Sequence, residues 1–349
     1  MCRILSAVFT VLCLGVMGLQ QVRAADVMTW EAYKERFVSD DGRVIDRANK
    51  DISHSEGQGY GLILALAAGD KPGFQKIWDW TRNNLQVRGR DRLLAWAWGR
   101  RPNGSWNVLD LNNATDGDLL VAFALLTAHE RWNVSEWQAA ARALIQDVKN
   151  HLLVETPDFP VLLPGYYGFV NDRGIIVNPS YYVYPALKMF SRHDDGPLWD
   201  KVFHGGLKLL DKARRTSWNL PGDWIIVLND RVELYRERSS RFGYEAIRTL
   251  LYLSWVENRD RLRTWTPVLD WFDKTGTLPV WVDLLDPALS LDEAPGGFYG
   301  VWARVARMLD RPETARKLQA RAQEKVAAEK DDYYSNTLYL LSQISFEKP

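Results

Sequence analysis

Three acidic side chains stand just ahead of strongly apolar stretches of the chain. They are Glu56, Asp116 and Glu245, and the apolar stretches cover residues 62–67, 119–128 and 250–253. Carboxyl groups that face each other across a bond can act as general acid and general base, which is the chemistry that cleaves a glycosidic linkage. If the apolar stretches are helices gathered about one axis, the three carboxylates converge at one end of the bundle.

Each acid also has a purely structural interpretation. Ser53 with Glu56, and Thr115 with Asp118, have the spacing of a capping box, in which the carboxylate reaches back to the amide that starts the helix. Glu245, in the first turn of its predicted helix, would only complement the dipole of that helix. Asp116 remains unexplained on this view, because a single cap does not need two carboxylates.

Helical periodicity dominates the chain, since apolar residues recur every three or four positions in twelve segments. These segments are 31–37, 59–68, 73–85, 118–131, 135–151, 185–191, 196–215, 244–256, 259–274, 298–309, 312–330 and 333–344. Short strands are predicted at 159–163, 175–177 and 224–228, as decorations of loops. The sequence therefore predicts an all-α protein.

Twelve helices paired as hairpins can either close into an (α/α)6 barrel of six hairpins or coil as an open solenoid. The helices that follow the three acids are apolar nearly all round, as helices buried on both sides must be. This pattern favours the closed barrel.

The first residues differ from the rest of the chain. Arg3 is followed by a nearly uninterrupted apolar run to Leu19 and by small residues, which is typical of a secretory signal peptide. We expect residues 1–24 to be removed and residues 25–349 to form one catalytic domain, exported to the bacterial periplasm or secreted. A retained N-terminal anchor is the alternative.

Composition excludes several classes of function. Lysine plus arginine equals aspartate plus glutamate at 44 each, so there is no basic excess for binding nucleic acid. The five histidines lack metal-ligand spacing, and both cysteines fall within the predicted leader. No phosphate loop, dinucleotide fingerprint or serine-nucleophile elbow is present. We therefore expect neither a metal nor a cofactor.

Aromatic residues give a second signal. The chain has 16 Trp and 14 Tyr, and flat rings can stack on the apolar faces of pyranose units. Most of these tryptophans lie on helical stripes and are expected in the core. Trp96 and Trp98 are predicted in a loop before Asp116, where they could contact substrate. Glycines beside the acids, such as Gly57 and Gly117, predict open space in which a polymer could lie.

These residues carry a resemblance to glycoside hydrolase family 8, and within it to the periplasmic endoglucanases that accompany bacterial cellulose synthesis. Residues 114–132 resemble the family signature Ala-Ser/Thr-Asp-Gly/Ala-Asp and the small-apolar helix after it. Ser55-Glu56-Gly57-Gln58 resembles the acid motif, residues 94–99 the tryptophan loop and residues 178–181 the tyrosine loop. The matches follow the family's order.

The resemblance implies an (α/α)6 barrel that hydrolyses a β-1,4-glucan chain with inversion. It makes Glu56 the general acid and Glu245 the base, with Asp116 binding and distorting the sugar ring at the cleavage subsite. Some descriptions of the family call that aspartate a nucleophile, but inversion needs none because water attacks directly. The remaining residues implied at the site are Trp96, which stacks a glucosyl ring, Tyr181 near the attacking water, Arg248, which holds the base, and Tyr244.

One position departs from the family pattern. The segment Tyr244-Glu245-Ala246-Ile247-Arg248 has glutamate where aspartate is commoner as the base. The extra methylene moves the carboxylate by about 1.5 Å, and a misplacement of an ångström can cost about a hundredfold in rate. If Glu245 is not the base, Asp223 or Glu237 would have to replace it.

Two other functions stay open on the sequence. The chain could be a non-catalytic glucan-binding component of a cellulose export complex, with a defective base in the same cleft. An α/α-barrel polysaccharide lyase would need a basic cleft for an acidic sugar, which the balanced charge does not favour. The protein is expected to act as a monomer, with the cellulose synthase machinery as a further partner.

Overall fold

The computed structural model describes residues 28–194, 196–213, 218–229, 231–286 and 288–346. The predicted signal peptide, residues 1–24, lies outside them. Within the described residues the chain forms thirteen α-helices and a few short strands. None of these helices is both long enough and apolar enough to cross a membrane.

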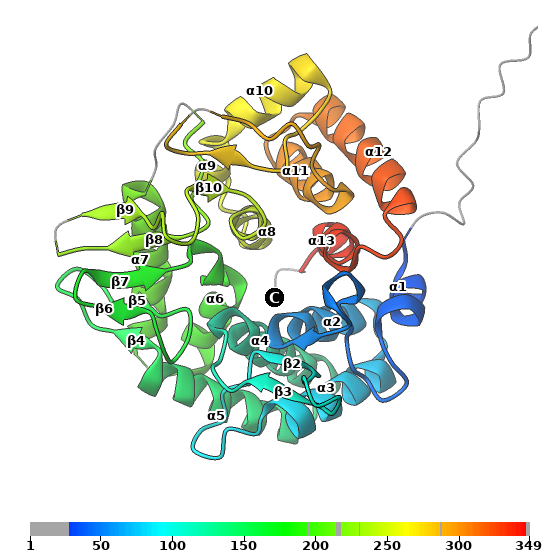
Figure 1. Cartoon of the computed structure of the whole chain (residues 1–349), viewed down its shortest axis with the longest axis vertical. Helices are drawn as coiled ribbons and strands as arrows, with labels where there is room; N and C mark the ends of the chain where they lie inside the picture. The colour runs from blue at the N-terminus through cyan, green and yellow to red at the C-terminus, as the bar shows by residue number, and fades with distance from the viewer. Residues whose placement is uncertain (1–27, 195, 214–217, 230, 287, 347–349) are drawn as a thin grey trace, which may run out of the picture.

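Six helices form a closed inner ring. They are α2 (Ser55–Ala68), α4 (Thr115–Trp132), α6 (Tyr184–His193), α8 (Ile247–Trp255), α11 (Gly296–Met308) and α13 (Tyr333–Gln343). Each contacts the next, and α13 contacts α2, so the ring closes on itself (Figure 1). Helices α2 and α8 are buried nearly all round, as their apolar sequences predict: every residue from Gly57 to Leu66 and every residue of α8 is buried.

The outer layer pairs one helical unit with each inner helix. It consists of α3 (Lys71–Leu85), α5 (Ser135–His151), α7 (Leu198–Lys212), α9 (Arg259–Arg263) with α10 (Thr266–Thr275), α12 (Pro312–Ala328) and α1 (Trp30–Phe37). The sixth pair joins α13 to α1, from opposite ends of the chain (Figure 1). The predicted (α/α)6 barrel is therefore confirmed.

The strands lie in loops, as predicted, and are mostly shorter than predicted. A four-stranded antiparallel sheet contains β6 (Val170–Asn171), β7 (Gly174–Val177), β8 (Ile225–Val227) and β9 (Val232–Leu234). Two further sheets have two strands each. One pairs β4 (Leu153–Val154) with β5 (Val161–Leu162), and the other pairs β10 (Arg241–Phe242) with β11 (Val282–Asp283). A three-stranded sheet of β1 (Ser53–His54), β2 (Ala97–Arg100) and β3 (Trp106–Asp110) was not predicted. Trp98 lies on β2, so its assignment to a loop was wrong.

Glycines let the inner helices approach closely rather than leaving open space. A Cβ on Gly59 would stand 2.6 Å from Cβ of Leu120, and one on Gly117 would stand 2.2 Å from Oγ of Ser55. Any larger residue would force α2 and α4 apart. The expectation of open space at these glycines was therefore wrong, and their effect is to draw two acidic helix ends together.

Helix boundaries differ from prediction where a side chain holds the backbone. Helix α2 starts four residues earlier than predicted, because the His54 ring accepts a hydrogen bond from the Gly57 amide at 3.1 Å. The predicted helix 259–274 is interrupted at Thr264 and Trp265, between α9 and α10. Pro267 has no amide with which to continue the helical hydrogen bonds from α9, and it stands instead in the first turn of α10, where none is needed.

Candidate active site

The guanidinium of Arg248 is the centre of the candidate site. Its Nη1 lies 2.6 Å from Oε1 of Glu56 and 3.0 Å from Oδ2 of Asp116, and its Nη2 contacts Oε2 of Glu245. Nη2 also donates to Oγ of Ser180 at 2.9 Å. The structure thus brings the three predicted carboxylates together around one cation, which presents its donors in a fixed planar fork.

The first turns of α2 and α4 place two of the acids. Glu56 is the second residue of α2, and Asp116 is the second residue of α4. Asp116 accepts a hydrogen bond from the Gly117 amide at 2.8 Å. The side chains of Glu56, Asp116 and Glu245 expose 18%, 1% and 34% of their surfaces. Glu245 is therefore partly open to solvent, Glu56 is mostly buried, and Asp116 is enclosed.

The predicted capping boxes do not form. His54 rather than Ser53 caps α2, and Glu56 turns to Arg248. The Thr115 hydroxyl donates to the Leu163 carbonyl at 2.6 Å, and α4 has no side-chain cap. Asp118 binds residues that precede the helix instead. The capping interpretation fails because each of these groups has a tertiary partner, which sequence spacing cannot reveal.

Glu245 stands in a turn ahead of α8, not in the first helical turn as predicted. Asp223 holds this turn, since its Oδ1 accepts from the amides of Gly243 and Ala246, both at 2.9 Å. Asn178 donates to Oε2 of Glu245 at 2.8 Å. Among the described residues no hydrogen-bond partner reaches the second oxygen, Oε1 of Glu245, so it is available to a water molecule.

The two substitute bases have other surroundings. Asp223 is buried, accepts a third hydrogen bond from the Ser239 hydroxyl at 3.0 Å, and burial raises its pKa to about 6. Glu237 is exposed on the surface and pairs with Arg173. Neither contacts the Arg248 cluster in the structure, whereas Glu245 is part of it.

One cation cannot neutralise three carboxylates. Burial raises the pKa of Asp116 well above its ordinary value, and repulsion from Glu56 adds to the effect. Burial also opposes the charge of Glu56, but contact with Arg248 outweighs it and lowers the pKa of Glu56 below its ordinary value. The surroundings therefore favour the protonated form of Asp116 and the ionised form of Glu56.

Aromatic side chains frame the cluster. The carbonyl of Trp96 accepts a hydrogen bond at 3.0 Å from the amide of Ser55, the residue before Glu56. The indole of Trp96 donates to Oδ2 of Asp110 at 2.9 Å. The Arg248 Cζ lies 5.5 Å from the ring centre of Tyr181. Tyr244 is exposed beside Glu245, and its carbonyl accepts from the Tyr334 hydroxyl at 2.6 Å. Thus the site residues implied by the resemblance occupy one region of the fold.

Several residues that build the site were not predicted from the sequence. Asn178 orients Glu245, and its own Oδ1 accepts from the amide and hydroxyl of Ser180, which in turn binds Arg248. Asn178 and Ser180 both stand in the tyrosine loop, residues 178–181, in which the resemblance assigned a role only to Tyr181. The buried hydroxyls of Tyr60 and Tyr252 hydrogen-bond at 2.7 Å. Their only signal was placement on the apolar inner helices.

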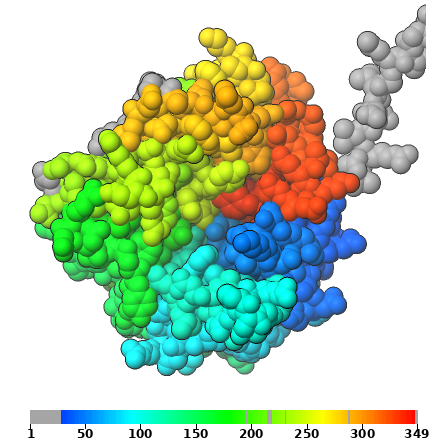
Figure 2. Space-filling view, viewed as in Figure 1, coloured from blue at the N-terminus to red at the C-terminus, as the bar shows by residue number. Residues whose placement is uncertain are grey.

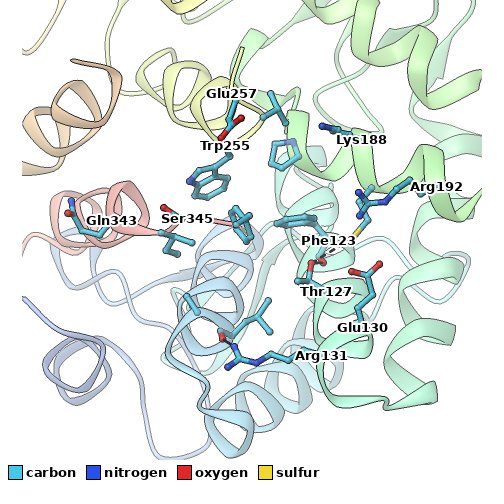
Figure 3. Close-up of a pocket in the computed structure, with 17 residues that line it drawn as sticks. Phe123, Thr127, Glu130, Arg131, Lys188, Arg192, Trp255, Glu257, Gln343 and Ser345 are labelled. Carbon is cyan, nitrogen blue, oxygen red and sulfur yellow. Dashed lines mark hydrogen bonds between the residues drawn. The ribbon is translucent and has the colours of Figure 1, made fainter. Parts of the chain in front are cut away.

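A large cavity lies at the other end of the inner helices. It is partly open, has a volume of about 880 Å³ and is lined by residues of α2, α4, α6 and α8, together with the end of α13 and the chain after it (Figure 3). None of the predicted site residues lines it. In the part of the chain that the structure describes, no group of three acidic, histidine or cysteine side chains could hold a metal ion.

The known proteins that this chain resembles include several endoglucanases. A probable endoglucanase of Novacetimonas hansenii is 36% identical over 282 residues, which cover 78% of this chain and 80% of that protein. An endoglucanase of Cellulomonas uda is 33% identical, covering 80% of this chain and 77% of that protein. The structure of endo-β-1,4-glucanase CMCax from Acetobacter xylinum superposes with a TM-score of 0.79 and 34% identity, over 90% of this chain and 95% of that one.

The family model described as glycosyl hydrolases family 8 matches residues 1–348. This chain belongs to glycosyl hydrolase family 8.

Proposed function

We propose that this protein hydrolyses internal β-1,4-glucosidic bonds of a glucan chain with inversion of configuration. The observation that carries the proposal is the placement of Glu56 and Glu245 on different nitrogens of Arg248, with a free oxygen on Glu245. The endoglucanase names of its relatives support a β-1,4-glucan as substrate.

The proposed reaction uses one carboxyl group on each side of the bond. Glu56 gives its proton to the glycosidic oxygen as the bond from that oxygen to C1 breaks. A water molecule attacks C1 from the opposite face and gives a proton to Oε1 of Glu245. The product has the opposite anomeric configuration, and exchange of protons with solvent restores both groups.

Substrate binding shifts the proton from Asp116 to Glu56. Before substrate binds, the raised pKa of Asp116 and the lowered pKa of Glu56 favour a proton on Asp116, whereas catalysis requires it on Glu56. Sugar hydroxyls that donate hydrogen bonds to Asp116 favour its ionised form, and the new negative charge raises the pKa of Glu56. The two carboxyl groups share Arg248 Nη1, so the proton has a short path. Asp116 thus binds the sugar and sets the charge of the acid.

Arg248 fixes the geometry rather than reacting. It binds Glu245 and Ser180 through Nη2, so the base cannot rotate away from the position at which it meets water. Tyr181 lies against the same guanidinium and closes one side of the water position. These contacts hold the base before substrate arrives, which reduces the reorganisation needed in the transition state.

We also propose that the chain is exported as a monomer with residues 1–24 removed, and that it works alongside a cellulose synthase. The predicted leader and the family resemblance support this proposal. Fractionation of bacterial cells, with N-terminal sequencing of the protein in the periplasm or medium, tests export. Finding the uncleaved chain in the cytoplasm would refute it.

Release of reducing ends from carboxymethylcellulose tests the activity. We expect the wild type to release them and Glu56→Gln to lose at least about a thousandfold in kcat, the size expected when an acid catalyst is removed. Glu237→Gln is the matched control, because that glutamate is exposed and paired with Arg173. Binding without release would support a glucan-binding component instead, and an unsaturated product absorbing in the ultraviolet would support a lyase.

A further inference from the structure

A buried carboxylate near the candidate site lies outside the cluster around Arg248. Asp118 is fully buried in the first turn of α4, two positions after Asp116. Burial raises the pKa of Asp118 to about 7, so an uncharged side chain at this position would avoid the cost of burying a charge. The presence of a carboxylate here therefore needs an explanation in its contacts.

Both oxygens of Asp118 accept hydrogen bonds from groups that precede α4. Oδ1 accepts from the Leu94 amide at 2.8 Å, and Oδ2 accepts from Nδ2 of Asn113 at 2.6 Å. The orientation of the Asn113 carboxamide follows from its other contact, because its Oδ1 accepts from the Tyr166 amide at 2.7 Å. A backbone amide can only donate, so both ends of this row of hydrogen bonds are donors.

Two donors at the ends restrict the two side chains between them. Those side chains must offer one acceptor to Leu94 and one to Tyr166, and must also donate one hydrogen bond between themselves. One carboxylate and one carboxamide meet these demands in either order. Two carboxamides do not, because every orientation leaves two donors face to face. A buried donor without an acceptor keeps its full cost of desolvation.

The Asp118–Asn113 pair holds the segment of chain that lies next to the general acid. Leu94 stands two residues before Trp96, whose carbonyl accepts from the Ser55 amide at 3.0 Å. Ser55 directly precedes Glu56 at the start of α2. This short segment is therefore bonded to Asp118 at one end and to the backbone of the acid at the other, so a displacement at Asp118 is passed on to Glu56.

We propose that Asp118 is a positioning residue for the reaction, and that the Asp118–Asn113 pair holds Glu56 where it meets the glycosidic oxygen. The requirement on the pair is the order of its donors and acceptors, not a negative charge at one particular position. This inference rests on the proposed function, because Asp118 acts through the general acid and touches no reacting atom.

Exchange of the two side chains tests this requirement. Asp118→Asn alone sets two donors face to face, so kcat on carboxymethylcellulose should fall about ten- to a hundredfold as the acid is displaced. Asn113→Asp added to Asp118→Asn makes the same hydrogen bonds in the opposite order, and should restore kcat to within about threefold of the wild type. Each rate is measured below the melting temperature of the variant, so that the folded protein is compared.

Asp194→Asn is the matched control, because it makes the same chemical change just after the last residue of α6. Asp194 accepts from Nζ of Lys149 and from the indole of Trp199, both at 2.9 Å. Loss of these contacts should lower the melting temperature and leave kcat at the wild-type value. The control thus separates a loss of stability from a loss of positioning.

A wild-type kcat in Asp118→Asn would overturn the proposal, and so would a folded double variant that is as slow as Asp118→Asn. If Asp118→Asn does not fold, the double variant decides: a folded and active protein supports the proposal, and a slow or unfolded one refutes it. If the wild type releases no reducing ends, the proposed function fails separately. The melting temperatures then test the pair, because recovery in the double variant supports the required order and no recovery refutes it.

Discussion

The two ends of the inner helices differ in what their side chains do. At the start of α2, at the start of α4 and in the turn before α8, three carboxylates crowd around Arg248. On the face in view in Figure 2, the blue, cyan and yellow-green parts of the chain that carry them meet near the centre, together with the red C-terminal part. Bringing like charges together in a partly buried place opposes folding, and a function must explain why they are there.

At the opposite end, aromatic rings pack against one another along the wall of the cavity. The Phe346 ring stands edge-on to Phe123 and to Trp255, with ring centres 5.2 and 5.0 Å apart. Arg304 donates to the Ile344 carbonyl at 2.5 Å and so holds the last part of the described chain in place. These contacts stabilise the barrel without crowding like charges. The same helices therefore serve packing at one end and chemistry at the other, and variants at the two ends should affect different measurements.

The largest effect on activity should come from the base. Glu245→Gln keeps the shape of the side chain but cannot accept a proton from water, so kcat should fall by about a thousandfold or more. Glu245→Asp keeps the charge and should be more active than Glu245→Gln. Steady-state rates on a soluble β-1,4-glucan measure both. Turnover by Glu245→Gln at the wild-type rate would transfer the role of base to another group.

A smaller loss should follow when the turn that carries the base is loosened. Asp223→Ala removes the acceptor of the Gly243 and Ala246 amides, and a displaced Glu245 should lower kcat about a hundredfold. Asp223→Asn keeps an oxygen for both amides and should stay within a few fold of the wild type. Equal losses in the two variants would instead indicate that the charge of Asp223 takes part in the reaction.

The pH dependence of activity should show that a charged Asp116 raises the pKa of Glu56, whereas Arg248 lowers it. An acid catalyst works only while protonated, so activity falls as pH rises through its pKa. In Asp116→Asn, Glu56 faces Arg248 without a negative neighbour, which lowers the pKa of Glu56. The alkaline limb of kcat against pH, which reports the substrate complex in which Asp116 is ionised, should therefore move to lower pH by about one unit. A limb that stays in place or moves to higher pH would contradict the shared proton.

The smallest effect on activity should come from the aromatic end. Phe346→Ala removes contacts with Phe123 and Trp255, which should lower the free energy of unfolding by about 1–2 kcal/mol for a partly buried ring. Thermal unfolding should show a lower melting temperature, while kcat on soluble glucan stays at the wild-type value. A large loss of kcat in the folded variant would show that the two ends are not independent.

The sequence predicted most of the architecture because its signals are periodic. The twelve apolar segments gave the inner and outer helices, and their burial pattern distinguished the closed ring from a solenoid. The boundaries depended on single tertiary contacts, such as the hydrogen bonds from Asp223 to the turn of Glu245. No local pattern predicts which distant residue makes such a contact.

The site was only partly predictable for the same reason. The three acids stand out by their position ahead of apolar segments, and Arg248 entered through the family resemblance. The sequence did not indicate that one guanidinium binds all three acids, or that Asn178 and Ser180 complete its surroundings.

The most direct test of the central claim follows the anomeric configuration of the first product by NMR, with cellohexaose as substrate. Water attack assisted by Glu245, opposite the oxygen protonated by Glu56, predicts that the α-anomer appears first and then equilibrates with the β-anomer. Initial release of the β-anomer would mean that a covalent intermediate forms, and would contradict the roles assigned to the carboxylates around Arg248.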